Sequence, residues 1–246
     1  MSVNIVLPIA GLGSRFTDMG YTKAKPFVDV NGYPMISQVL RNLSYPDANY
    51  ILLVRKEHLE QEKELFTALG KELCLSTVAI DRVTEGAVCT VLYAHKLINN
   101  DDQLIVANSD QIIDEKFSDF VDHCLSSGDD GVIMTFRDET MNPKWSFAEV
   151  DKEGSVLQVK EKVPISDYAT VGIYMFKKGK YFVDAALDMI IRNERVNNEF
   201  YVCPVYNYMI KSNKSVTIYN ILASSMHGLG TPEDLDAYLS LNNFVT

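Results

Sequence analysis

The chain has 246 residues, a formal net charge of -10 and four widely spaced cysteines. This length suits one large α/β domain with a well-buried core. The acidic balance argues against a general nucleic-acid surface, which needs many clustered Lys and Arg side chains. No apolar run approaches the length of a membrane span, the N-terminus lacks a signal-peptide pattern, and the cysteines form no CxxC or Cys/His cluster. These features predict a reduced, cytoplasmic protein with no nucleic-acid or membrane partner.

Apolar, β-branched runs alternate with longer amphipathic stretches over most of the chain, and the pattern becomes strand-rich after residue 136. We expect strands at residues 4–9, 50–54, 76–80, 103–107, 131–136, 146–150, 168–176 and 215–220, with a hairpin around 151–154. We expect helices at residues 35–43, 57–69, 86–97, 117–126, 178–192, 199–211 and 232–241. The alternation predicts a Rossmann-like α/β fold, in which a mostly parallel mixed sheet carries helices on both faces. Ligands of such sheets bind outside the carboxyl ends of the strands.

A glycine-rich turn, AGLGSRF at residues 10–16, directly follows the first expected strand. Glycines permit close backbone approach and positive φ, so that consecutive N–H groups can converge on phosphate oxygens. Arg15 adds a planar fork suited to a phosphate, and Lys25 adds a point charge. The motif is neither the Walker pattern nor a complete GxGxxG, because Phe16 stands where the third glycine would be. A polyphosphate site is the favoured interpretation, and a plain tight turn is the alternative.

Several further motifs follow in a fixed order: KAKPFVDVNGYPMI, TEGAVCTVLYA, VANSDQII, VKEKVPISDYATVGIYMF and HGLGTPEDL. Together with GLGSRF, they resemble the sugar-phosphate and alcohol-phosphate nucleotidyltransferases of the pyrophosphorylase type. Enzymes of that family join a nucleoside triphosphate to a phosphorylated small molecule and release pyrophosphate. The resemblance covers nearly the whole chain. It implies a GT-A-like three-layer sandwich in a single domain over 1–246, with a nucleotide-binding half at about 1–136 and an acceptor-binding half at about 137–246.

Asp110 ends an apolar run, the position where α/β enzymes place catalytic groups. By resemblance it is the metal ligand, and Mg²⁺ suits the site because that ion takes one or two carboxylates plus substrate oxygens. The alternative is an aspartate that caps the next helix. Related enzymes often carry a second aspartate where this chain has Gly228, so no second ligand follows from the resemblance. His227 next to it is open to three interpretations: a ligand, a phosphate contact or a packed histidine.

The resemblance implies further nucleotide contacts after the expected strands at residues 4–9, 76–80 and 103–107. An ionised Asp81 can only accept hydrogen bonds, and cytosine offers an amine donor where uracil and thymine offer an oxygen. CTP is therefore favoured over UTP or dTTP, with a solvated Asp81 out of register as the alternative. The full set of expected nucleotide-binding residues is Ala10, Gly11, Gly13, Asp81, Glu85, Gly86 and Ser109.

The second half of the chain is expected to hold the phosphorylated acceptor. By resemblance Lys162 meets the acceptor phosphate, although a solvent-facing Glu-Lys pair in a charged hairpin is the alternative. Glu199 is open to two interpretations, an acceptor contact or the start of a helix, and Trp145 to a pocket, core or interface role. The expected acceptor-binding residues are Trp145, Glu161, Val171, Gly172 and Glu199.

These expectations combine into a Mg²⁺-dependent nucleotidyltransferase, with Arg15, Lys25 and Lys162 as catalytic residues. The acceptor is left open among a sugar-1-phosphate, phosphocholine, a glycerol or amino-alcohol phosphate, and phosphoglutamine. The family suggests a precursor for capsular or other surface polysaccharide, and a homo-oligomer is compatible with this interpretation. Two rival classes are a metal-dependent glycosyltransferase and a catalytically silent nucleotide-binding sensor.

Overall fold

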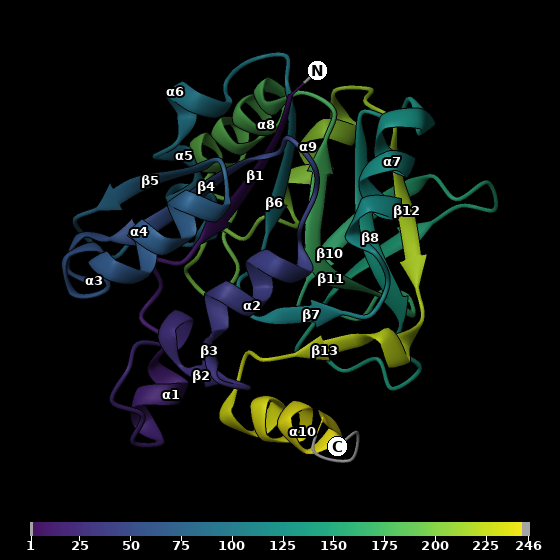
Figure 1. Cartoon of the computed structure of the whole chain (residues 1–246). Helices are drawn as coiled ribbons and strands as arrows, with labels where there is room; N and C mark the ends of the chain where they lie inside the picture. The colour runs from purple at the N-terminus through teal and green to yellow at the C-terminus, as the bar shows by residue number, and fades with distance from the viewer. Residues whose placement is uncertain (1, 243–246) are drawn as a thin grey trace.

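A nine-stranded mixed sheet forms the centre of the computed structural model, which describes residues 2–242 (Figure 1). The strands are β1 Val3–Pro8, β2 Asp29–Val30, β3 Tyr33–Pro34, β4 Asn49–Arg55, β5 Leu75–Ile80, β6 Gln103–Ala107, β7 Gln111–Ile113, β8 Gly131–Arg137, β9 Ser146–Val150, β10 Val156–Glu161, β11 Tyr168–Phe176, β12 Val216–Ile221 and β13 Met226–Gly228. The helices are α1 Ser14–Asp18, α2 Met35–Asn42, α3 Lys56–Gln61, α4 Lys63–Glu72, α5 Ala87–Leu92, α6 His95–Ile98, α7 Phe117–Ser127, α8 Gly179–Ile191, α9 Val205–Lys211 and α10 Pro232–Asn242.

The order of the strands confirms the expected fold class. The path runs β10-β9-β11-β6-β1-β4-β5, and β8 pairs with both β11 and β12. Strands β6, β1, β4 and β5 are parallel, as is the β8–β12 pair, whereas β11 runs antiparallel to β6 and β8. The carboxyl ends of β1, β5 and β6 therefore meet at one edge, which is where an α/β sheet places its ligand.

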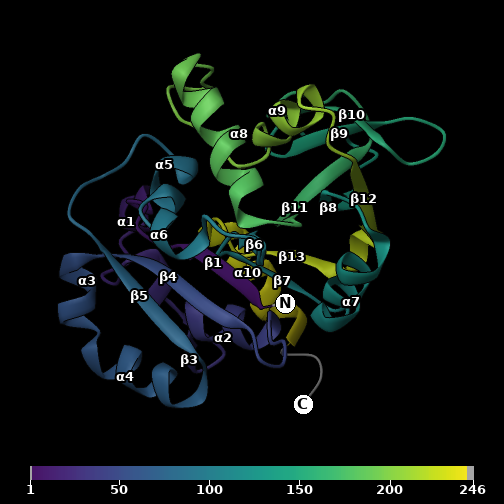
Figure 2. The same cartoon turned by 90° about the horizontal axis from the view of Figure 1, so that it is seen from above.

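Each central strand buries both faces, because its side chains alternate between two apolar layers. In β1, Ile5 and Leu7 belong to one layer and Val6 belongs to the other. Helices α2 and α7 pack on the first layer, while α5, α8 and α9 pack on the second. Figure 2 shows these two groups of helices on opposite sides of the sheet. Among residues 2–242, no helix has the length and apolarity needed to cross a membrane.

Three expected helices differ from the structure. The one at 57–69 is divided into α3 and α4, the one at 86–97 is divided into α5 and α6, and the one at 199–211 begins only at Val205. The late start has a local cause. The Phe200 N–H donates to the Glu85 carbonyl at 2.8 Å, and the Phe200 carbonyl accepts from the Val88 N–H at 3.0 Å, so both groups are used outside a helix. The very short strands β2, β3, β7 and β13 were not predicted either.

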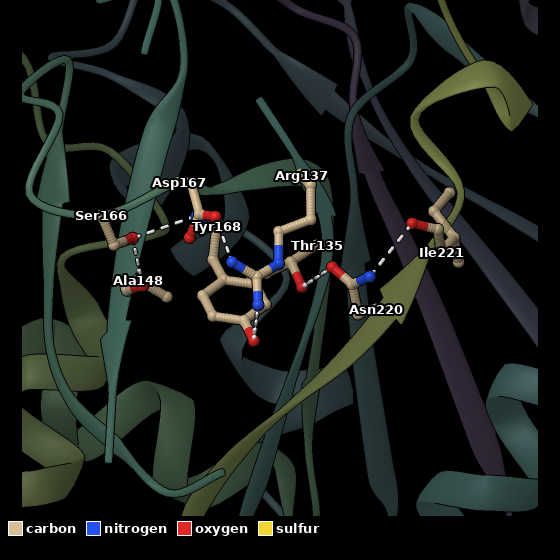
Figure 3. Close-up of polar contacts among 8 residues, drawn as sticks. All are labelled: Thr135, Arg137, Ala148, Ser166, Asp167, Tyr168, Asn220 and Ile221. Atoms are coloured by element: carbon tan, nitrogen blue, oxygen red, sulfur yellow. Dashed lines mark hydrogen bonds and ion pairs between the residues drawn. The ribbon is translucent and has the colours of Figure 1, made fainter. Parts of the chain in front are cut away.

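Arg137 at the end of β8 holds the loop between β10 and β11, which begins with Lys162 (Figure 3). Its guanidinium pairs with the Asp167 carboxylate, donates to the Tyr168 hydroxyl at 2.5 Å and lies 3.8 Å from the centre of that ring. The Ser166 hydroxyl of the same loop donates to the Ala148 carbonyl at 2.6 Å. The loop is thereby fixed to both β8 and β9.

Candidate functional site

A cleft of about 730 Å³ lies at the carboxyl ends of β1 and β6 and extends along β11. This volume is within the range of small-molecule sites, roughly 300 to 1,000 Å³. Its walls come from the loops after β1, β5 and β6, from the residues on either side of β9 and β10, and from the β13–α10 turn. Figure 1 shows α1, β13 and α10 together at this end of the sheet.

The glycine-rich turn forms one wall of the cleft. Gly13 immediately precedes α1 and has φ +62°, a left-handed conformation that glycine adopts without steric cost. A Cβ at this position would lie 2.8 Å from the Cβ of Lys25, so the glycine also permits the close approach of that lysine. Phe16, which replaces the third glycine of a dinucleotide motif, is fully buried and anchors α1 in the core. The Arg15 side chain lines the cleft and has no hydrogen bond or ion pair within residues 2–242.

Lys25 and Asp110 form an ion pair at the base of the cleft, with side chains that are 20% and 25% exposed. Asp110 follows β6, and its backbone carbonyl accepts a hydrogen bond from the Leu229 N–H at 2.6 Å. A Cβ at Gly230 would lie 3.1 Å from Asp110 Oδ2, which is closer than most Cβ contacts. Glycine at this position therefore leaves room beside the carboxylate. The sequence predicted both charged groups for one site, and the structure brings the two side chains together.

The donor groups suit a metal that shares its ligands with phosphate. Among the described residues, no group of three or more His, Cys, Asp or Glu side chains is arranged to hold a metal by itself. Asp110 instead holds a cation already, the Lys25 ammonium, in a partly exposed position. One carboxylate together with substrate oxygens matches the usual coordination of Mg²⁺ at phosphate sites. His227 does not line this cleft and pairs with Asp114 at 2.9 Å.

The loop after β5 divides into residues that reach the cleft and residues that do not. Thr84, Gly86 and Ala87 line the cleft, whereas Asp81 and Glu85 do not. Asp81 is exposed and accepts two hydrogen bonds from Arg82, at 2.9 and 3.2 Å, and these bonds lower the pKa of its carboxyl. Glu85 pairs with Arg195 at 2.7 Å. Asp81, the residue expected to contact the base, is therefore held by its neighbour Arg82 and does not line the cleft.

Gly86 joins this loop to the other wall. Its φ is +116°, and a Cβ there would lie 2.5 Å from the Phe200 backbone nitrogen and 2.6 Å from its oxygen. Only glycine therefore lets the Phe200 backbone come close enough to form the two backbone hydrogen bonds with residues 85–88 that are described above. The residues that follow Phe200, including Tyr201, are brought into the cleft as a result.

The opposite wall is a network of paired polar groups. The Lys162 ammonium donates to the Tyr201 hydroxyl at 2.7 Å, and its backbone N–H donates to the Trp145 carbonyl at 3.1 Å. Lys162 adopts φ +57°, which is uncommon for a residue with a side chain and directs the chain out of β10. Buried Glu161 accepts a hydrogen bond from the Ser146 hydroxyl, and burial raises the pKa of this carboxyl.

Gly172 lies in an irregularity of β11, where pairing with β8 shifts between Thr170 and Tyr174. Its φ is +92°, and a Cβ would lie 2.3 Å from the Asn108 side-chain nitrogen. The glycine thus allows Asn108, which follows β6, to enter the cleft beside β11. Sequence motifs pointed to Gly172, but Asn108 was missed.

Most of the expected site residues are brought together in this cleft. Those that line it are Ala10, Gly11, Gly13, Arg15, Lys25, Gly86, Ser109, Asp110, Trp145, Glu161, Lys162, Val171, Gly172 and Glu199. Sequence reasoning missed Thr84, Asn108, Lys144, Tyr201 and Asp234, which line it too. Thr84, Asn108 and Asp234 lie within the quoted motifs, and Tyr201 lies two residues after Glu199, so these positions were the available signal.

Residues 4–211 match the profile of the nucleotidyl transferase family. The chain belongs to this family. A mannose-1-phosphate guanylyltransferase catalytic subunit beta from Dictyostelium discoideum is 26% identical over 174 residues, covering 68% of this chain and 48% of that protein. A mannose-1-phosphate guanylyltransferase from Mycobacterium tuberculosis is 24% identical over 239 residues, covering 94% of this chain and 62% of that protein. The chain spans about half the length of the curated relatives it matches.

Solved structures of other nucleotidyl transferases share the fold. A nucleoside-diphosphate-sugar pyrophosphorylase from Vibrio cholerae RC9 superposes with a TM-score of 0.81 at 25% identity, covering 96% of this chain and 99% of that one. An inositol-1-phosphate CTP transferase from T. maritima superposes with a TM-score of 0.76 at 12% identity, covering 97% and 94%. The second likeness concerns the fold alone.

Proposed function

We propose that this nucleotidyl transferase transfers a nucleoside monophosphate from a nucleoside triphosphate to a phosphorylated small molecule and releases pyrophosphate. The observation that carries the proposal is the placement of Arg15, Lys25 and Lys162 around one cleft with Asp110 and the glycine-rich turn. Family membership supports the same reaction. A glycosyltransferase, which starts from a nucleotide sugar, would not need three cations for a free triphosphate and a second phosphate.

In the proposed reaction a phosphate oxygen of the acceptor attacks the α-phosphorus, and the bond from the α-phosphorus to the pyrophosphate oxygen breaks. The acceptor phosphate is already ionised, so no covalent intermediate with the protein is required. Lys162 orients this phosphate, while Arg15 and Lys25 stabilise charge on the leaving pyrophosphate. Mg²⁺ held by Asp110 would neutralise charge on the α-phosphate when bound. The halves at about 1–136 and 137–246 then hold nucleotide and acceptor, respectively, within a single domain over 1–246.

CTP is the nucleotide we propose, with UTP and dTTP as alternatives. The support is the acceptor chemistry of the Asp81 carboxylate, which matches the cytosine amine. This contact requires Asp81 to leave Arg82 when the nucleotide binds. In a test, Asp81→Asn, whose amide can also donate, should move the preference from CTP toward UTP. An unchanged preference would remove Asp81 from base recognition. GTP belongs in the same comparison, because two relatives are named as guanylyltransferases.

We further propose a cytoplasmic enzyme that makes an activated precursor for capsular or other surface polysaccharide. The acceptor classes are those given by the sequence: a sugar-1-phosphate, phosphocholine, a glycerol or amino-alcohol phosphate, or phosphoglutamine. The cleft itself contributes a buried carboxyl, Glu161, and an exposed one, Glu199. Both groups are hydrogen-bond partners for acceptor hydroxyls or amines.

The decisive experiment is a pyrophosphate-release screen of CTP, UTP, dTTP and GTP against a panel of these acceptors with Mg²⁺. Release that depends on both substrates, and that Arg15→Ala lowers by about a hundredfold or more, is the expected result. Binding of a triphosphate without turnover on any acceptor would instead favour a silent sensor. Hydrolysis of a nucleotide sugar without pyrophosphate release would favour a glycosyltransferase.

A further inference from the structure

The carboxylate of Asp234, near the start of α10, occupies the space beside Gly228. A Cβ at Gly228 would lie in ordinary van der Waals contact with this carboxylate, 3.7 Å from both Cγ and Oδ2 of Asp234, so the carboxylate lies where a side chain from position 228 would point. Gly228 is in β13 and pairs with Gln111, the residue after Asp110. Asp234 and Asp110 both line the main cleft. The fold therefore directs a second carboxylate toward the end of the cleft that holds Asp110.

Each of these carboxylates faces a lysine that also lines the cleft. Asp110 pairs closely with Lys25, whereas Lys144 Nζ lies 3.5 Å from Asp234 Oδ1 and 4.4 Å from the centre of the Trp145 ring. The second pair is long and about a third to a half exposed, so it holds Asp234 only weakly. A ligand rich in phosphate attracts both ammonium groups and leaves both carboxylates available to a cation.

We propose that Asp234 supplies a second carboxylate ligand, beside Asp110, to the divalent metal that arrives with the triphosphate. This inference rests on the proposed function. Mg²⁺ at phosphate sites takes one or two carboxylates together with phosphate oxygens, which matches two carboxylates and no larger acidic group among the described residues. Gly228 itself brings no carboxylate to the site, and the carboxylate of Asp234 lies next to it.

A purely structural role for Asp234 makes different predictions. Its backbone N–H donates to the Thr231 hydroxyl at 3.1 Å, which caps α10 without the Asp234 side chain. The Asp234 carboxylate could instead serve only to pair with Lys144 or to favour the start of the helix. Removal of the Lys144 side chain would then reproduce part of the effect of removing the Asp234 carboxylate. A metal ligand would not behave in this way, because Lys144 competes with the metal for the same oxygen atoms.

The test measures the affinity for CTP, UTP, dTTP and GTP by isothermal titration calorimetry, with and without Mn²⁺. The quantity compared is the enhancement of triphosphate affinity by Mn²⁺, which does not depend on turnover. We expect Asp234→Asn to reduce this enhancement about tenfold or more, since even an indirect metal partner commonly has that effect. Lys144→Met should not reduce it. The double variant Gly228→Asp with Asp234→Asn should restore the enhancement, because a Cβ at position 228 lies next to the Asp234 carboxylate and the new carboxylate can take its place.

Asp114→Asn is the matched control, since Asp114 is an aspartate close to β13 that does not line the cleft. Circular dichroism verifies that each variant is folded. An undiminished Mn²⁺ enhancement in Asp234→Asn, or an equal loss in Lys144→Met, would overturn the inference while leaving the proposed function intact. Failure of the wild-type protein to bind any of the four triphosphates would overturn the proposed function, and this inference with it.

Discussion

The two walls of the cleft are built in different ways. The glycine wall, residues 10–15, is largely exposed beyond Ala10, and none of its side chains makes a hydrogen bond or ion pair among the described residues. The polar wall, residues 143–146, 161–162 and 199–203, contains the Lys162–Tyr201 and Glu161–Ser146 pairs. The first wall therefore keeps the backbone N–H groups of residues 11–13 and the Arg15 side chain free for a ligand. The second is preorganised, because its polar groups already hold one another in position.

The polar wall is joined to the loop after β5 at a junction where the Phe200 backbone packs against Gly86. Two backbone hydrogen bonds join residues 85–88 to Phe200, and Arg195 adds an ion pair with Glu85 while lying 4.3 Å from the centre of the Phe200 ring. The difference between the two walls implies three kinds of outcome.

Changes in the glycine wall should lower turnover. Changes in the polar wall should lower kcat/KM for the acceptor, and changes at the junction should lower the free energy of unfolding.

The largest effect is expected from Arg15→Ala in the glycine wall. Arg15 has no structural partner in the described residues, so its loss should leave the melting temperature nearly unchanged. Removal of a donor that acts in the transition state costs on the order of a hundredfold or more in rate, which steady-state pyrophosphate release would measure. Lys23→Ala is the matched control, because Lys23 is nearby but does not line the cleft. Near-normal turnover in Arg15→Ala would contradict the proposed role.

A smaller and more selective effect is expected from Lys162→Ala in the polar wall. A hydrogen bond to a charged group contributes about 1.5–3 kcal/mol, equivalent to roughly a tenfold to hundredfold loss in kcat/KM for the acceptor. Triphosphate affinity, measured by calorimetry, should stay the same. Lys160→Ala on the exposed part of β10 should leave both quantities unchanged. An equal loss of triphosphate affinity in Lys162→Ala would show that the two walls do not divide the substrates as proposed.

The junction is tested by Gly86→Ala, which places a Cβ against the Phe200 backbone. A residue held in a conformation of this kind costs about 1–3 kcal/mol, and the contact adds to that cost. Urea unfolding should show a lower free energy of unfolding in this variant. Gly70→Ala in α4 should instead stabilise the protein by roughly 0.5–1 kcal/mol, since its Cβ meets nothing within 4 Å and the helix favours alanine. Equal unfolding free energies for the two variants would rule out the strained junction.

The smallest expected effect is a pH dependence at Glu161. Burial raises the pKa of this carboxyl, although the Ser146 hydrogen bond and Lys162 oppose the shift. Since the folded protein binds this proton more tightly, the contribution of Glu161 to stability is greatest when it is protonated and is lost as pH rises through its raised pKa. The free energy of unfolding of Glu161→Gln, relative to the wild type, should therefore increase over that interval. A difference that stays constant with pH would contradict the shift.

The sequence predicted the fold class, and most of the site residues it predicted line the cleft, for a simple physical reason. Strands with β-branched, apolar residues are recognisable, and the residues that follow parallel strands must meet at one edge. Asp81 was the main exception, because a hydrogen bond from the adjacent Arg82 decides where its carboxylate points. Tyr201 and the late start of α9 depend on backbone bonds between Phe200 and residues 85–88, which are distant in sequence. Such contacts leave no periodic signal, and the three-residue strands β7 and β13 are too short to show one.

The account depends most on the claim that the glycine wall receives a triphosphate. The direct measurement is a crystal structure of the protein soaked separately with CTP, UTP and dTTP in the presence of Mg²⁺. We predict phosphates of at least one nucleotide against the Gly11–Gly13 backbone and Arg15, with the metal at Asp110. A triphosphate bound elsewhere, with this wall left empty, would contradict the account.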